Sequence, residues 1–178
     1  MLTHRGVVGW SFGGIIAFEV ARHLLKSDVA VKGVILIDSP SPLNHVPLSD
    51  GLIDSIVKLN RNSSVGLLVK RQFQMNSQML LHYDPTVDGG PYPQLVLLCS
   101  REDYYPDGGL EVPSWLSSNS HRHSAAAGWE TIVGKPIKCI DIPGHHFQLF
   151  HNHYVRVRSN FLLTQCLYYD RSHPRSLR

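Results

Sequence analysis

The most constraining stretch of this sequence is Gly9-Trp10-Ser11-Phe12-Gly13-Gly14, which follows a short apolar run and precedes a longer one. The residues before it have the composition of a strand, and residues 15–21 have that of a buried helix. A serine at the apex of such a sharp turn adopts a strained backbone. We therefore expect Gly9 and Gly13 to be required, because a β-carbon at either position would collide as the helix folds back over the strand. The Ser11 hydroxyl should then stand clear of the sheet.

Three further apolar segments predict parallel strands. Residues 29–37 are rich in β-branched side chains, as is typical of a central parallel strand, and residues 94–100 and 137–142 are similarly apolar. The helix after Ser11 is expected over residues 13–26 and, because it is apolar nearly all round, it should be buried. A terminal helix is expected over residues 150–168.

The remaining segments differ in composition and in the spacing of their apolar residues. Apolar residues recur at helical spacing within residues 44–88, which predicts two or three helices inserted between two strands. This is the usual position of a lid, although a helical hairpin that only packs would look the same. Residues 104–128 are rich in Pro, Gly, Ser, His and Tyr and are expected to form a surface loop with at most one helical turn. Candidate pocket-lining residues in the lid, which could equally be ordinary packing positions, are Phe73, Met75, Met79, Leu80 and Tyr83.

Composition restricts the function classes. A chain of 178 residues with 43% hydrophobic and 17% charged content has the profile of one globular domain. Its net charge of +3 is too weak and scattered to indicate nucleic-acid binding, and residues 169–178 are expected to be a solvated basic tail. No apolar run has the length of a membrane span or a signal peptide. We therefore expect neither nucleic acid nor a membrane as partner, and a cytoplasmic location.

Cysteines and histidines give no sign of a metal site. The three cysteines, Cys99, Cys139 and Cys166, form no C-x-x-C pair, so we interpret them as reduced thiols, the first two in buried strands. The pairs His121/His123 and His151/His153 lack a third ligand at suitable spacing. We expect the first pair to lie in a loop and the second at the start of a helix, and we predict no metal ion.

A serine, an aspartate and a histidine each follow a predicted strand: Ser11, Asp38 and His146. Because the carboxyl ends of parallel strands converge on one crevice, these side chains should meet. Serine needs a base to become a nucleophile; a histidine would take its proton, and a carboxylate would orient the imidazole. Spacing leaves two choices open, since His145 competes with His146, and Glu102 or Asp103 competes with Asp38.

The pattern G-x-S-x-G between strand and helix, and the order serine, acid, histidine, are those of α/β-hydrolases. The predicted fold class is therefore α/β: the C-terminal part of an α/β-hydrolase fold, with a mostly parallel sheet, flanking helices and an inserted lid, over residues 1–168. Only ten residues precede Ser11, so the first strands of such a sheet are expected to be missing. The Phe12 N–H is the candidate oxyanion donor, and the loop that lends a second donor would be missing too.

Several stretches resemble the thioesterase domains that end polyketide synthases and nonribosomal peptide synthetases, most of all the fungal polyketide type. They are residues 9–14 with the following Ile-Ile-Ala-Phe-Glu-Val-Ala-Arg-His-Leu, residues 35–40 (Ile-Leu-Ile-Asp-Ser-Pro) and residues 143–147 (Pro-Gly-His-His-Phe). The resemblance implies that Asp38 is the acid, in preference to Asp103, and that the second histidine, His146, is the base.

The resemblance also implies a reaction and a partner. Ser11 would take an acyl chain from the phosphopantetheine thiol of an acyl or peptidyl carrier domain and release it to water, to a hydroxyl or amine of the chain, or to a carbon nucleophile. The protein itself would need no cofactor, and the missing N-terminal half of the same synthase is a further expected partner. Two other hypotheses remain: a small-molecule carboxylesterase with the same triad, and a non-catalytic remnant that binds a partner.

Overall fold

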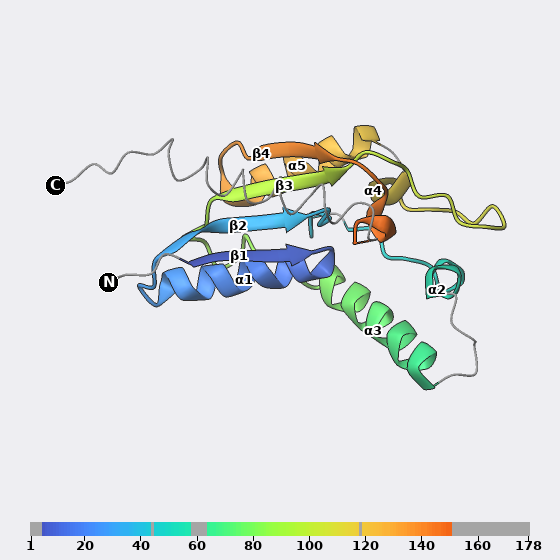
Figure 1. Ribbon diagram of the computed structural model, residues 1–178. Coiled ribbons are helices and arrows are strands. Elements are labelled where there is room, and N and C mark those ends of the chain that lie inside the picture. The colour runs from blue at the N-terminus through green and yellow to red at the C-terminus, as the bar shows by residue number, and fades with distance from the viewer. Residues whose placement is uncertain (1–4, 44, 58–63, 118, 151–178) are drawn as a thin grey trace.

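The computed structural model describes residues 5–43, 45–57, 64–117 and 119–150, and its strands form one parallel sheet (Figure 1). Strand β1 spans Arg5–Trp10, β2 Val31–Ile37, β3 Leu95–Ser100 and β4 Lys138–Ile142. They lie in the spatial order β1-β2-β3-β4, and each neighbouring pair is parallel. The predicted strands are confirmed, and all four carboxyl ends lie at the same edge of the sheet.

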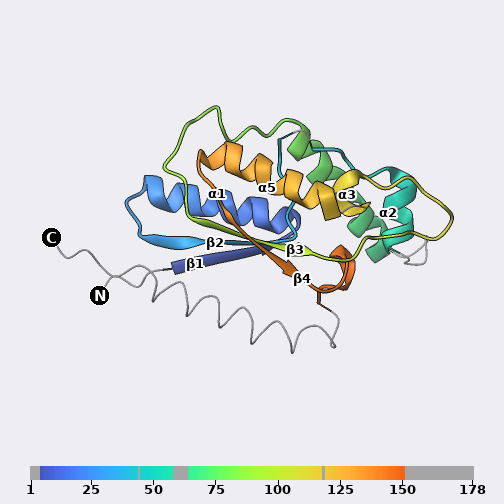
Figure 2. The same cartoon turned by 90° about the horizontal axis from the view of Figure 1, so that it is seen from above.

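Two helices cover one face of the sheet. Helix α1 (Phe12–Lys26) and helix α5 (Asn119–Val133) lie side by side on that face (Figure 2). Phe18 from α1 and Trp129 from α5 are fully buried, with their rings 5.1 Å apart, over Leu36 and Leu97 of the sheet. This packing fixes the start of α1, and therefore the turn at Ser11, against the strands.

The predicted helical insertion between the second and third strands is confirmed. Helix α2 (Asp50–Val57) and helix α3 (Ser64–Leu81) lie beyond the carboxyl ends of the strands (Figure 1). Lys70 Nζ lies 2.8 Å from Asp54 Oδ1, and Gln74 Nε2 donates to Asp50 Oδ1 at 2.7 Å, so the two helices are joined directly. A gating role for this pair stays a prediction.

The short elements also gather at the carboxyl edge of the sheet. Helix α4 spans Ser114–Ser117, and a 3₁₀ turn, η1, spans His146–Gln148.

None of the helices in the part of the chain that the structure describes is long and apolar enough to cross a membrane.

Several expectations were wrong. Residues 104–128 are not a loop throughout, because α5 begins at Asn119 and its backbone includes His121 and His123. Its alanines favour a helix, and Trp129, Ile132 and Val133 form a buried stripe at helical spacing that its serines and histidines obscured.

Two burial expectations were also wrong. Helix α1 is not buried all round, since Ile16 is 46% and Val20 44% exposed on the side away from its packing contacts. Cys99 is buried, but Cys139 is exposed, because β4 has a neighbour on only one side among the described strands. The expected terminal helix, the basic tail, Cys166, His151 and His153 lie outside the described residues.

Candidate active site

The turn between β1 and α1 holds Ser11 in a strained backbone conformation, with φ 52° and ψ −128°. Its N–H donates to the carbonyl of Ile37 at 2.9 Å, so the serine is tied to the end of β2. A β-carbon at Gly9 would lie 2.0 Å from the Gly13 carbonyl oxygen, as expected from the sequence. The expectation for Gly13 was wrong, because a β-carbon there meets nothing within 4 Å. The second crowded position is Gly14, where it would lie 1.9 Å from Ser39 Oγ.

The structure brings the predicted serine, histidine and aspartate into one hydrogen-bonded series. His146 Nε2 lies 2.9 Å from Ser11 Oγ, and His146 Nδ1 lies 2.9 Å from Asp38 Oδ2. The side chains come from the ends of β1 and β2 and from the turn after β4. In this arrangement the imidazole can accept the serine proton while the carboxylate holds the opposite ring N–H.

Asp38 is held by a residue that sequence reasoning did not single out. The Ser100 N–H donates to Asp38 Oδ1 at 2.8 Å, and the Ser100 hydroxyl donates to Asp38 Oδ2 at 2.6 Å. Burial by itself would raise the pKa of Asp38, but the hydrogen bonds from His146 and Ser100 and the attraction of His146 outweigh it, so the pKa lies below its usual value. The carboxylate therefore stays ionised beside the imidazole.

The other acids and the other histidine are engaged elsewhere. Glu102 Oε1 accepts the Gly144 N–H at 2.9 Å, which ties down the turn before His146. Asp103 Oδ2 accepts the hydroxyl of the exposed Tyr105 at 3.1 Å. His145 Nδ1 accepts the Phe147 N–H at 3.2 Å, and its ring packs against another aromatic side chain. The geometry therefore favours Asp38 and His146 over the alternatives that spacing had left open.

Aromatic rings enclose His146, which is 3% exposed. The ring centroids of Trp10, Phe147 and Trp115 lie 5.1, 4.8 and 5.5 Å from that of the imidazole. Trp115 also holds a loop in place, through a 2.9 Å hydrogen bond from its Nε1 to the Val46 carbonyl. Trp129, on α5, belongs instead to the buried core. No sequence signal links Trp115 to the triad, because it lies on a separate short helix.

Phe12 is the first residue of α1, so its N–H belongs to the first turn, where backbone donors have no carbonyl acceptor within the helix. Such donors, at the positive end of the helix dipole, suit an oxyanion formed beside Ser11. The structure thus places the candidate oxyanion donor directly after the candidate nucleophile.

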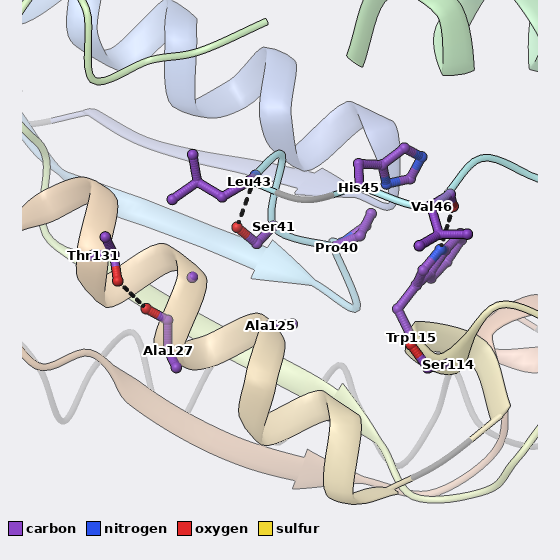
Figure 3. A pocket seen from close by; sticks show the side chains of 11 residues that line it. Pro40, Ser41, Leu43, His45, Val46, Ser114, Trp115, Ala125, Ala127 and Thr131 are labelled. Carbon is purple, nitrogen blue, oxygen red and sulfur yellow. Dashed lines mark hydrogen bonds between the residues drawn. The ribbon is translucent and has the colours of Figure 1, made fainter. Parts of the chain in front are cut away.

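Two concave surfaces flank these residues. An apolar groove of about 630 Å³ runs between α1, at Phe12, Ile15 and Ile16, and the end of α3. Of the five lid residues expected to line a pocket, Met79, Leu80 and Tyr83 line this groove, and Phe73 and Met75 do not. A second cavity, of about 340 Å³, lies between the loop after β2 and helices α4 and α5 (Figure 3). The described residues contain no group of three or more His, Cys, Asp or Glu side chains placed to hold a metal ion.

Removing the Ser100 hydroxyl should lower the stability of the protein by an amount that depends on pH, because Asp38 loses a hydrogen bond. In Ser100→Ala we expect the unfolding free energy to fall by about 1–3 kcal/mol at neutral pH, because a hydrogen bond to a buried carboxylate is lost. Stability from a depressed carboxyl pKa is present above the unfolded-state pKa and disappears as the pH falls through the folded-state pKa. The difference in unfolding free energy between the wild-type and Ser100→Ala proteins should therefore shrink as the pH falls below 3.8, the ordinary pKa of an aspartate. Urea unfolding at a series of pH values from 7 downward measures it.

Thr131→Ala is the matched control for this experiment. The Thr131 hydroxyl donates to the Ala127 carbonyl at 2.8 Å, so its loss removes a bond to a group that does not titrate. A difference that stays constant with pH in Ser100→Ala, as expected for Thr131→Ala, would contradict the role assigned to Ser100.

The parallel sheet, its flanking helices and the serine, histidine and aspartate at its carboxyl edge place this protein in the α/β-hydrolase class. Residues 6–162 match the model of the thioesterase domain family, and the chain belongs to that family.

Relatives of known name agree with this assignment. The chain is 40% identical to orsellinic acid synthase ArmB of Armillaria ostoyae over 91% of its own length, but spans only 8% of that synthase. It is 31% identical to the thioesterase frbD of Dothideomycetidae sp. (strain 11243), covering 90% of this chain and 64% of frbD. The resemblance to thioesterase domains of synthases is thereby confirmed.

Solved structures support the fold. The NocB thioesterase domain, in covalent complex with a fluorophosphonate nocardicin G analogue, superposes with a TM-score of 0.62 at 20% identity, covering 86% of this chain and 62% of that one. The surfactin-cyclising thioesterase domain SrfTE superposes with a TM-score of 0.56 at 19% identity, covering 92% and 68%. At these identities the likeness concerns the fold alone.

Proposed function

We propose that this chain is the acyl-releasing part of a serine thioesterase, with Ser11 as nucleophile, His146 as general base and acid, and Asp38 as the group that orients the imidazole. The observation that carries the proposal is the unbroken series of 2.9 Å contacts from Ser11 Oγ through His146 to Asp38. Serine is a weak nucleophile without such a base, and a surface serine would have no reason to be held at positive φ.

The first step forms an acyl-serine. Ser11 Oγ attacks the thioester carbonyl carbon as its proton passes to His146 Nε2, and the carbonyl oxygen becomes an oxyanion facing the Phe12 N–H. The carbon–sulfur bond then breaks, and the departing sulfur takes the proton from His146. Asp38 stabilises the imidazolium that exists between these transfers.

The second step releases the acyl group. A water molecule, or a nucleophile within the acyl chain, gives its proton to His146 and attacks the ester carbon, after which Ser11 Oγ leaves and recovers the proton. Water yields an acid, whereas an internal hydroxyl, amine or carbon nucleophile yields a ring. The enclosure of His146 by aromatic rings restricts the water that can reach the ester.

The proposed substrate is a polyketide acyl thioester on the phosphopantetheine arm of a carrier domain. The names of the related orsellinic acid synthases support an aromatic polyketide in particular. In this proposal Met79, Leu80 and Tyr83 contact the apolar part of the thioester, because their groove begins at Phe12, next to the nucleophile. No bound cofactor is required, since the acid–base chemistry uses side chains alone.

The test is a comparison of a thioester and an oxygen ester that carry the same acyl group. We expect the full chain to cleave an aryl thioester with a kcat/KM at least about tenfold above that of the matched oxygen ester, and to act faster still on the carrier-bound form. A preference for the oxygen ester would instead identify a carboxylesterase. A folded chain that cleaves neither would favour a non-catalytic role. Ser11→Ala controls for background hydrolysis.

A further inference from the structure

The turn between β4 and η1 carries His146, and one buried residue of this turn, Gly144, is held by a different segment of the chain. Gly144 has φ 89°, a conformation that residues with a β-carbon rarely adopt. Its N–H donates to Glu102 Oε1 at 2.9 Å, and its carbonyl oxygen accepts the Glu102 N–H at 3.3 Å. Both backbone polar groups of Gly144 are therefore bonded to a single distant residue.

The segment that holds this turn also holds the aspartate of the triad. Ser100, the last residue of β3, bonds Asp38 through both its N–H and its hydroxyl. The Arg101 N–H donates to the carbonyl of Ile142 at 2.8 Å, which joins the end of β3 to the end of β4. Glu102 follows directly in the sequence. Three consecutive residues thus link the aspartate to the turn that carries the histidine.

Loss of the Glu102 carboxylate would move the imidazole of His146. A buried N–H without an acceptor is unfavourable, so the turn would have to shift until the Gly144 N–H found water. Only His145 separates Gly144 from His146, so the imidazole would shift with the turn. Its two 2.9 Å contacts tolerate little movement, because displacing a catalytic group by about 1 Å can lower a rate by on the order of 100-fold.

From this geometry we propose that Glu102 is a positioning residue, which keeps His146 Nε2 within hydrogen-bond distance of Ser11 Oγ by holding Gly144. The inference rests on the proposed function, because the position of the imidazole affects turnover only if Ser11 and His146 react. Glu102 acts through an oxygen acceptor and not through its charge, which distinguishes it from the acid of a triad. Glutamine offers a carbonyl oxygen at the same side-chain length, so Glu102→Gln should preserve the arrangement.

The kinetic test measures kcat and KM of the full chain on an aryl thioester. In Glu102→Ala we expect kcat to fall about 10- to 100-fold and KM to change less than about twofold, because the imidazole is displaced while the substrate-binding surfaces remain. Glu102→Gln should stay within about threefold of the wild-type kcat, since a neutral acceptor forms a somewhat weaker bond than a carboxylate. An unchanged kcat in Glu102→Ala, or an equal loss in Glu102→Gln, would overturn the proposal.

Two further variants complete this test. The matched control is Glu130→Ala, which also removes a carboxylate that accepts a backbone N–H, that of Ile137 at 3.0 Å, at the opposite end of β4. It should leave kcat unchanged. Glu102→Met keeps the length of the side chain without an oxygen acceptor, so it should behave as Glu102→Ala does and replaces that variant if thermal unfolding shows that it is not folded.

A measurement without substrate separates this inference from the thioesterase proposal. The proton on His146 Nδ1, held by Asp38, should give a far-downfield NMR signal that is absent in His146→Ala. We expect this signal to broaden or disappear in Glu102→Ala and to persist in Glu102→Gln and Glu130→Ala. Its loss in Glu102→Ala, when the wild-type chain shows no turnover, would leave the positioning role standing and remove the thioesterase. A signal that is unchanged in Glu102→Ala would remove the positioning role alone, whether or not the wild-type chain turns over.

Discussion

Replacing Ser11 by alanine is expected to abolish covalent labelling of this chain by a fluorophosphonate. The reagent adds to a hydroxyl where a base accepts its proton and an N–H donor stabilises the phosphoryl oxygen; the proposed base is His146, and the proposed donor is the Phe12 N–H. The wild-type chain should gain one adduct in its intact mass, and the Ser11→Ala chain none. Removing a triad serine lowers hydrolase activity by on the order of 10⁶-fold, so the contrast should be complete.

Two further variants make this result specific. His146→Ala leaves Ser11 in place but removes its base, so the labelling rate should fall by about 10²- to 10⁴-fold. Cys139→Ser removes an exposed thiol from β4 and should change nothing. An adduct that persists in Ser11→Ala would mean that another nucleophile reacts. The absence of an adduct on a folded wild-type chain would contradict the proposal that this chain is catalytic by itself.

Gly9→Ala is expected to destabilise the protein severely although it adds only one methyl group. The added β-carbon would lie 2.0 Å from the Gly13 carbonyl oxygen and 2.6 Å from the Gly14 nitrogen. Both atoms are backbone, so no side-chain rotation relieves the collision and the start of α1 must move away from β1. We expect a loss of about 4 kcal/mol or more in unfolding free energy, measured by urea unfolding, together with loss of fluorophosphonate labelling.

Gly13→Ala provides the matched control at the neighbouring glycine of the same turn. A β-carbon there meets nothing within 4 Å, and Gly13 lies inside α1, where alanine is favoured over glycine by about 1 kcal/mol. Stability should therefore stay the same or rise slightly. Equal damage from both substitutions would show that the turn is intolerant of any side chain, rather than crowded at Gly9.

Local sequence was sufficient to predict the turn at Ser11 and the strands, because their signals lie in contiguous residues. The apolar run 29–37 and the G-x-S-x-G pattern need no distant partner to be recognised. The same approach failed at α5, whose serines and histidines obscured a buried stripe that becomes visible only against the sheet. It also chose Gly13 over Gly14, because the collision at Gly14 involves Ser39 from the end of β2.

The choice of the acid and the histidine that act with Ser11 also needed more than the spacing of residues along the chain. Spacing left His145, Glu102 and Asp103 in competition, and the resemblance to thioesterase domains favoured Asp38 and His146. The structure places His146 against Ser11 and Asp38 against the other ring nitrogen of His146, and it engages the competitors in local hydrogen bonds. Of the candidate lid residues, Met79, Leu80 and Tyr83 line the groove, whereas Phe73 and Met75 do not, because only the end of α3 lies close enough to α1 to form it.

The sequence by itself determined the class of fold. Through its resemblance to thioesterase domains it also indicated the family and the three residues proposed for catalysis, because each of these residues lies in a short motif that follows a strand. Only the tertiary structure decided what surrounds them. Ser100 reaches Asp38 from a neighbouring strand, Trp115 reaches His146 from a separate helix, and Glu102 reaches the turn before His146 from the segment after β3. These contacts join residues far apart in the chain, and no periodicity or spacing within one segment can specify which distant side chains will meet.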